Sequence, residues 1–314
     1  MLLKEQHPVQ GVVKILHQGA LRFILVLHHD FPTYLAEYYF PVVDAIPAEC
    51  TQLRNLVLST LPPTLAEFPD PFANGLQVKL LPGIKDSPVV CGDIVGRLHK
   101  ANLKELVDNV IAGGGGDGAQ ESAGDRVGSI IEQLQAAPVS GGVSVDASTM
   151  NTLVLYVGMS AIEAAEKDGV PSFQPDGVHA ALLSHVAIGL KPYGRHPLGV
   201  WGEVTDLLGR HFFLSAVANH LRYPNSHTYY FHCLILHIFD CAGGHPEEER
   251  VREQIARVLV ERLVVHRPHP WGLIITLLEL FRSREQEFWN LPAVRQAPEV
   301  GNPVQRLLQY EVLT

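Results

Sequence analysis

The chain has 314 residues, 46% of them hydrophobic, and its 33 acidic side chains outnumber its 24 basic ones, giving a formal charge of −9. This balance argues against a surface that binds nucleic-acid phosphates over its whole extent. No uninterrupted apolar run reaches the roughly 18 residues of a membrane span. Lys4, Glu5 and His7 interrupt the apolar core that a signal peptide needs. These features predict a soluble intracellular protein with no membrane segment.

The first part of the chain, residues 11–111, follows a short linker at residues 1–10 and carries helical spacing. Val12, Ile15, Leu16, Gly19 and Phe23 recur at three- and four-residue steps. A short aromatic helix should follow, with Thr33 as its cap. Four prolines in the segment from Phe68 to Pro88 predict an extended loop. The helices expected in this part are Gln10 to Leu27, Tyr34 to Phe40, Ala48 to Leu61 and Leu98 to Ile111.

A glycine-rich stretch, residues 112–128, separates this part from the rest. Its small polar residues cannot bury enough apolar surface to offset the entropy of ordering, so we expect a flexible insertion. A phosphate-binding loop would need the lysine of G-x-x-x-x-G-K-[ST], which is absent here.

The remaining chain, residues 129–314, reads as a further helical part of the same domain. Gly169 and Pro171 should end its first helix, and Pro246 followed by three glutamates should start a later one. Its helices are expected near Met150 to Ala165, Gly177 to Leu190, Leu198 to Arg222, Thr228 to Asp240, Pro246 to Leu263 and Trp271 to Phe281. Every predicted element is helical, which favours an all-α fold.

Two helix corners of similar sequence suggest a repeat. Pro224 disfavours helical geometry at Tyr223, and Asn225 or Ser226 can cap the next helix. A second proline corner, His266 to Trp271, follows about forty-four residues later. Helix pairs stacked at this period indicate a HEAT-like, α-solenoid-like array of helical hairpins, a class that commonly holds other proteins.

Catalytic and metal chemistry find little support among the sixteen histidines. His227, His232 and His237 are five residues apart, which turns successive rings by about 140° around a helix. His28-His29-Asp30 has no companion motif such as H-E-x-x-H, and no G-x-S-x-G elbow is present. We expect no catalytic residue, metal or cofactor. The competing hypotheses are a His-dependent metal hydrolase and an RNA-binding helical array.

Polar and aromatic residues at the corners are the candidate partner-binding site. Arg54 and Asn55 also interrupt an otherwise apolar helix. One interpretation is that these side chains cap neighbouring helix ends and fix the repeat geometry. The other is that they bind the backbone of an extended partner peptide. The candidates are Arg54, Asn55, Arg222, Tyr223, Asn225, His227, Arg267, His269 and Trp271.

Six segments, in order along the chain, resemble one family. They are VLHHDFP (26–32), CTQLRNL (50–56), FPDPF (68–72), LVLYVG (153–158), NHLRYPNSHTYY (219–230) and ERLVVHRPHPWGL (261–273). Together the chain resembles the C-terminal domain of the large Not-type scaffold subunit of the Ccr–Not deadenylase complex. The glycine-rich stretch after Ala112 and the segment Gly189–Trp201 depart from the family pattern and are interpreted as insertions.

The resemblance implies a non-catalytic HEAT-like domain that docks the Not-type heterodimer subunits through extended anchor segments. It further implies indirect contact with RNA-binding regulatory proteins, continuation into the remainder of the scaffold chain, and roles in messenger RNA deadenylation and decay and in translational repression. Direct RNA binding and membrane contact are not implied. Such a protein is expected in the cytoplasm, with the nucleus as a second location.

Overall fold

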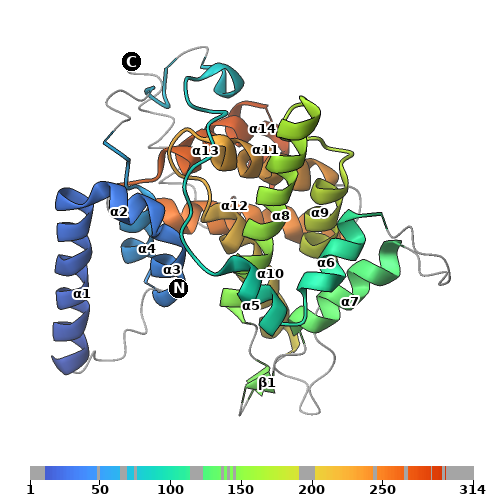
Figure 1. The fold of residues 1–314 in the computed structure, drawn as a ribbon, viewed down its shortest axis with the longest axis horizontal. Helices are drawn as coiled ribbons and strands as arrows, with labels where there is room; N and C mark the ends of the chain where they lie inside the picture. The colour runs from blue at the N-terminus through green and yellow to red at the C-terminus, as the bar shows by residue number, and fades with distance from the viewer. Residues whose placement is uncertain are drawn as a thin grey trace.

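The computed structural model describes residues 11–47, 50–63, 69–73, 76–113, 123–135, 138–139, 142–143, 146–190, 202–242, 246–264, 268–283, 285–291 and 294. Within these ranges the regular secondary structure is helical except for one antiparallel pair, β1 (Pro138–Val139) and β2 (Gly142–Val143), in which Pro138 lies opposite Val143. The all-α prediction is therefore confirmed (Figure 1). The predicted linker at residues 1–10 and residues 114–122 of the predicted insertion lie outside the described ranges.

The first four helices surround a small hydrophobic cluster. Leu35, Tyr39, Val57 and Leu58 are almost fully buried in it. Its helices are α1 (Gly11–Asp30), α2 (Pro32–Glu37), α3 (Tyr39–Ala45) and α4 (Thr51–Leu58). The prediction of a single aromatic helix here is wrong, because helical geometry is interrupted at Tyr38, between α2 and α3. The Thr33 cap is also wrong: Pro32 occupies the first turn of α2, where its missing N–H costs nothing.

The middle of the chain differs from the prediction at two further places. The predicted helix Leu98 to Ile111 is two helices, α5 (Ile94–Lys100) and α6 (Lys104–Ile111), because Asn102 adopts φ 55° between them. Asparagine tolerates this left-handed conformation better than most residues. The glycine-rich insertion ends early, since α7 (Ala123–Gln135) buries Val127, Ile130 and Leu134. The loop between α4 and α5 includes a short 3₁₀ turn, η1 (Val78–Leu80).

The second part of the chain forms the larger core around α8, which runs through the middle of the molecule (Figure 1). Gly169 ends α8 in the left-handed conformation, as predicted. α10 ends at Ala218 rather than Arg222, since residues 219–225 form the corner itself. The helices are α8 (Ala147–Asp168), α9 (Val178–Gly189), α10 (Gly202–Ala218), α11 (Ser226–Cys241), α12 (Pro246–Val264), α13 (Trp271–Ser283) and α14 (Glu285–Asn290).

α1 stands at one edge of the molecule and is largely exposed (Figure 1). Its predicted apolar stripe exists, but of its residues only Ile24 is buried. Among the described helices, α1 is long and apolar enough to cross a membrane, judged by length and composition only. Its sequence contains no uninterrupted apolar run of that length, so the sequence pattern did not predict this. Lys14 and Arg22 lie within α1. In a stacked helical array such a stripe is the face that packs against the neighbouring helix, and on α1 this face is exposed.

Candidate functional site

The corner between α10 and α11 is held by its own polar side chains. The Asn225 side chain accepts a hydrogen bond from the Thr228 N–H (2.9 Å) and donates one to the Tyr223 carbonyl (2.7 Å). The Thr228 hydroxyl accepts from the Arg222 N–H (3.1 Å). Asn225 thus caps α11 as predicted, and the backbone groups freed by Pro224 are satisfied locally.

Arg222 joins this corner to the first helices. Its Nη1 donates to the Ala36 carbonyl (3.1 Å), and its guanidinium lies 3.8 Å from the Tyr39 ring centroid. The Tyr39 hydroxyl is hydrogen bonded to Nδ1 of His220 (2.9 Å), and the His220 ring stacks on Phe231. Arg222 is only 2% exposed, so its guanidinium is in contact with aromatic ring faces, which attract a cation, and has little contact with water.

A buried chain of hydrogen bonds, which we call the seam network, crosses between the two hydrophobic clusters. Asn219 accepts from Arg262 (2.7 Å) and donates to Asn151 (2.9 Å). Asn151 donates to Asp44 on α3 (3.3 Å), and Asn55 on α4 donates to the Arg262 carbonyl (2.6 Å). The seam network therefore ties α3 and α4 to α8, to α12 and to the corner that follows α10. Buried polar groups linked in this way specify one packing arrangement.

Most of the predicted partner-binding residues are engaged inside the fold. Arg54 donates twice to the Ile46 carbonyl, and the Trp271 indole donates to the Pro69 carbonyl. His269 is half-buried, and Arg267 lies outside the described residues. The side chains of Arg54, Asn55, Arg222, Tyr223, Asn225, His227 and Trp271 are all buried. Their burial leaves little of these side chains for a partner to contact and favours the first interpretation, in which they fix helix geometry.

Burial favours the neutral form of two histidines at the corner between α10 and α11, His220 and His227. Burial, with a smaller effect from Arg222, lowers the pKa of His227 to about 4. Burial also lowers the pKa of His220 well below its ordinary value, with His227, Arg222 and Arg262 adding to the effect. His232 bonds the Thr276 hydroxyl on α13. No group of three His, Cys, Asp or Glu side chains that could hold a metal occurs among the described residues.

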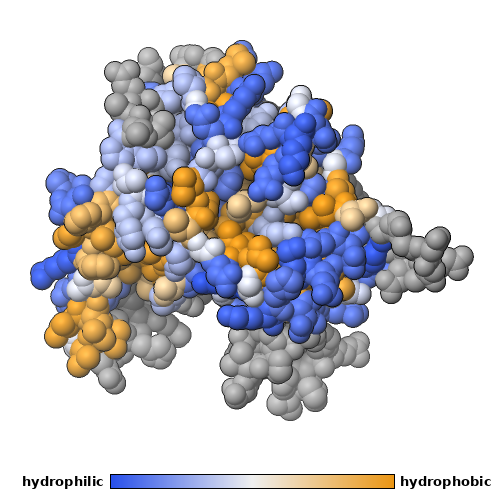
Figure 2. All heavy atoms as spheres, viewed as in Figure 1, coloured by the Kyte–Doolittle hydropathy of each residue, from blue (hydrophilic) through white to orange (hydrophobic). Residues whose placement is uncertain are grey.

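Two exposed apolar surfaces were not identified by sequence reasoning, because periodicity shows a stripe but not whether anything covers it. The first, the α1 face, consists of Val12, Val13, Ile15, Leu16, Phe23 and Val26, which are 49% to 69% exposed. Figure 2 shows hydrophobic side chains gathered over this helix at the left edge. The second, the aromatic surface, consists of Phe31, Tyr34, Tyr38 and Val89.

The aromatic surface has a defined geometry. The rings of Tyr34 and Tyr38, one helical turn apart, stack with centroids 4.5 Å apart. Val89 lies on the segment that reaches α2 through a hydrogen bond from the Cys91 N–H to the Glu37 carbonyl (2.9 Å). Exposed rings of this kind offer large contact area with little conformational entropy to lose, as protein interfaces require.

Comparison of the whole sequence with known proteins shows the family to which it is similar. The model for the CCR4-Not complex component Not1 matches residues 2–200 and 202–308. General negative regulator of transcription subunit 1 of Schizosaccharomyces pombe is 34% identical over 292 residues, which cover 91% of this chain and 12% of that protein. CCR4-NOT transcription complex subunit let-711 of Caenorhabditis elegans is 35% identical over 301 residues, covering 95% and 10%. The chain thus spans only about a tenth of these relatives.

Two solved structures share the fold. The NOT1 superfamily homology domain from Chaetomium thermophilum superposes with a TM-score of 0.80 and 31% identity, covering 96% of this chain and 56% of that one. A Not1 C-terminal domain in complex with Not4 superposes with a TM-score of 0.75 and 24% identity, covering 95% and 56%. The matching regions are helical arrays, in agreement with the predicted fold class.

Proposed function

The chain belongs to the Not1 family of CCR4-Not complex components, and from this premise we propose that it is a non-catalytic scaffold domain. It docks the Not-type heterodimer subunits of the complex and continues into the remainder of a longer scaffold chain. RNA-binding regulatory proteins reach it through those partners. Its role is then to support messenger RNA deadenylation, decay and translational repression, in the cytoplasm and, as a second location, the nucleus.

The observation that carries this proposal is the pair of exposed apolar surfaces on an otherwise well-packed fold. A protein without partners rarely leaves apolar groups exposed in contiguous patches, whereas binding surfaces do. Phe23 is 61% exposed and Tyr34 47%, although residues of the same kinds elsewhere in the chain, such as Phe213 and Tyr230, are buried.

The two surfaces suit different partners. The α1 face has the three- and four-residue spacing of a helix-packing stripe, and nothing lies within 4 Å of a Cβ placed at Gly19. A further helix of the longer scaffold chain can therefore pack closely along it. The aromatic surface is a small group of exposed side chains that includes two stacked tyrosine rings, which suits the apolar anchors of an extended Not-type segment. Such a segment orders as it binds, so its affinity per unit area should be modest.

The test is capture of the purified Not-type heterodimer by immobilised chain. Tyr34→Glu with Tyr38→Glu places two carboxylates on the aromatic surface, and capture should fall by at least about tenfold, since desolvating either charge is costly. Leu80→Glu is the matched control, because Leu80 is 71% exposed on η1 and belongs to neither surface. Wild-type capture by the double variant, with an unchanged melting temperature, would remove the aromatic surface from the proposal.

The solved Not1 C-terminal domain supports the scaffold role, because it is in complex with another protein, Not4. The net charge of −9 agrees with this class and gives no support to the RNA-binding alternative. Binding of unstructured RNA by the pure chain at physiological salt, in the absence of protein partners, would favour that alternative instead.

A further inference from the structure

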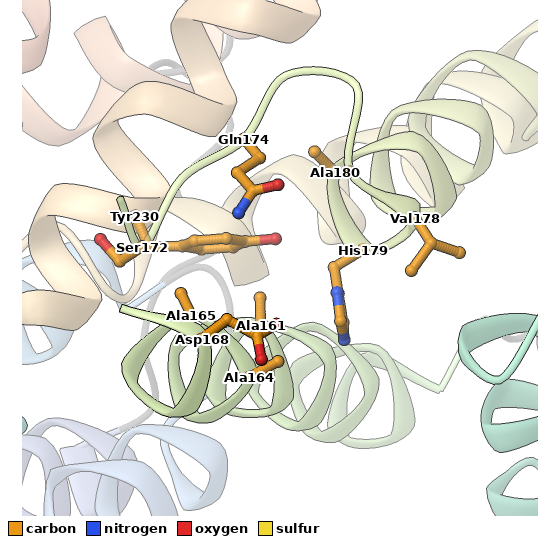
Figure 3. A pocket seen from close by; sticks show the side chains of 11 residues that line it. Ala161, Ala164, Ala165, Asp168, Ser172, Gln174, Val178, His179, Ala180 and Tyr230 are labelled. Atoms are coloured by element: carbon orange, nitrogen blue, oxygen red, sulfur yellow. The ribbon is translucent and has the colours of Figure 1, made fainter. Parts of the chain in front are cut away.

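A small open pocket lies away from both apolar surfaces, between the end of α8, the loop that follows it, the start of α9, and α11 (Figure 3). Its volume is about 170 Å³. A cavity of roughly 150 Å³ accommodates a ligand the size of benzene, so this pocket fits one amino-acid side chain but no helix.

The base of the pocket presents an unused hydroxyl. Tyr230 on α11 is 1% exposed, and its Oη has no hydrogen-bond partner among the described residues. In Figure 3 the Tyr230 ring enters the pocket between Gln174 and the alanines of α8, with the hydroxyl at its centre. Burial raises the pKa of this hydroxyl, so it stays protonated and can donate. A buried donor without an acceptor costs stability, which phenylalanine at this position would avoid.

The walls combine small apolar groups with both kinds of hydrogen-bonding group. Ala161, Ala165 and Ala180 contribute methyl groups. α9 begins at the pocket, and its N-cap residue Gly177 has no side chain to accept hydrogen bonds from the N–H groups of the first turn, so the donor end of this helix lies at the pocket wall. Asp168 lines the pocket and supplies an acceptor.

These groups discriminate among possible side chains. An aliphatic side chain would leave the Tyr230 hydroxyl unsatisfied. A carboxylate would meet the like charge of Asp168, and an ammonium would meet the donor end of α9. A carboxamide supplies what both sides need, because its oxygen accepts and its NH₂ donates.

We propose that this pocket binds the carboxamide side chain of a glutamine in an extended peptide segment, with the Tyr230 hydroxyl donating to the amide oxygen and Asp168 accepting from the amide nitrogen. This inference depends on the proposed scaffold function in one respect: the glutamine is taken to belong to a partner protein. It adds a second, polar anchor point on α8, α9 and α11.

The test uses a small probe, so it does not depend on capture of the Not-type heterodimer. The chain carrying ¹³C-methyl alanine is titrated with N-acetyl-L-glutamine methylamide and followed by NMR. Saturable shifts are expected for the methyl groups of Ala161, Ala164, Ala165 and Ala180. The glutamate and leucine analogues should bind roughly tenfold more weakly. Equal binding of the leucine analogue, tighter binding of adenosine, or no saturable shift would overturn the proposal.

Two variants separate binding from folding. Tyr230→Phe removes only the hydroxyl, so probe affinity should fall by roughly threefold to tenfold while the melting temperature holds or rises. Tyr229→Phe is the matched control, since Tyr229 does not line the pocket, and it should bind the probe normally. Unchanged affinity in Tyr230→Phe, or a lower melting temperature, would show that the hydroxyl serves the fold instead. Probe binding that persists when heterodimer capture fails would leave this site standing without the proposed function.

Discussion

Asn225 uses both ends of its amide within the corner that it occupies, and Arg222, His220 and His227 are buried around it. A proline corner rich in polar residues was predicted from the sequence, and so was the cap on α11. The sequence could not decide whether the remaining polar groups face a partner or the protein interior. That depends on Ala36 and Tyr39, which are more than 180 residues away along the chain and meet the corner only in the fold.

Replacing the cap should cost stability in a defined range. Asn225→Ala removes the acceptor for the Thr228 N–H, and we expect the free energy of unfolding to fall by about 0.5–2 kcal/mol. Thr33→Ala is the control, because Thr33 resembles a cap in sequence but provides none to α2. Its cost should stay within about 0.5 kcal/mol. Urea unfolding of both variants measures the difference, and equal costs would contradict the capping role of Asn225.

The buried histidines should make the protein less stable in mild acid. His227 has a pKa of about 4 in the folded protein but near 6.5 in the unfolded chain. As the pH falls below about 6.5, His227 therefore becomes protonated in the unfolded chain, whereas in the folded protein it stays neutral until about pH 4. Between pH 7 and pH 5 this site alone should lower the free energy of unfolding by about 2 kcal/mol.

His227→Gln should reduce that pH dependence, measured by urea unfolding at pH 7 and pH 5. The dependence that remains would come from His220, whose pKa is also lowered, and from carboxylates. His17→Gln, at an exposed position on α1, should leave the wild-type dependence intact. If His227→Gln retained the full pH dependence, His227 would not be neutral in the folded protein.

Element by element, the prediction succeeded where helices have one strongly apolar face or clear end signals. The stripe Val251, Ile255, Val258, Leu259 and Leu263 of α12 is buried as expected. The same reasoning failed at Tyr38 and Asn102, because short breaks between helices carry no change in apolar spacing. It also missed Ala123 as the start of α7, because small residues that resemble a linker continue into an amphipathic helix.

The buried stripe of α12 and the exposed stripe of α1 should respond differently to truncation. Leu259→Ala is expected to lower the free energy of unfolding by about 2–5 kcal/mol, since it leaves a cavity in the larger core. Val12→Ala on the exposed α1 face should change it by less than about 0.5 kcal/mol. Thermal and urea unfolding report both values, and a small effect at Leu259 would show that α12 does not pack as described.

The contact between α8 and α11 depends on a missing side chain. A Cβ at Gly158 would overlap the ring of Phe231, so Gly158→Ala should destabilise the fold by about 1–3 kcal/mol despite alanine's better helix propensity. Gly128→Ala on α7 is the control, because nothing lies within 4 Å of its Cβ position, and it should be neutral or stabilising. A stabilising effect at Gly158 would mean that the two helices lie farther apart.

Across the described residues, a small cluster around α1 to α4 and a large one built from α5 to α14 are joined by Tyr156, which packs against both, and by the seam network. Joined in this way, the described helices form a support on which the α1 face and the aromatic surface are held in fixed positions. A scaffold needs this rigidity, because its partners must find apolar surfaces already in place.

Breaking the seam network should weaken both clusters. Asn219→Ala leaves Arg262 and Asn151 with unsatisfied buried groups, which costs about 1–3 kcal/mol. Ser172→Ala, outside the network, is the control and should cost under about 0.5 kcal/mol. Hydrogen exchange should speed up in α4 and in α12 together in Asn219→Ala. Acceleration confined to one cluster would contradict a network that couples them.

The most direct test of the central claim is hydrogen exchange of the chain alone and saturated with the purified Not-type heterodimer. Scaffolding through the aromatic surface predicts slower exchange in α2 and in the segment around Val89, with the already buried corner at residues 219–228 unchanged. Protection at that corner without any at α2 would contradict the claim and restore the buried polar residues as the partner site.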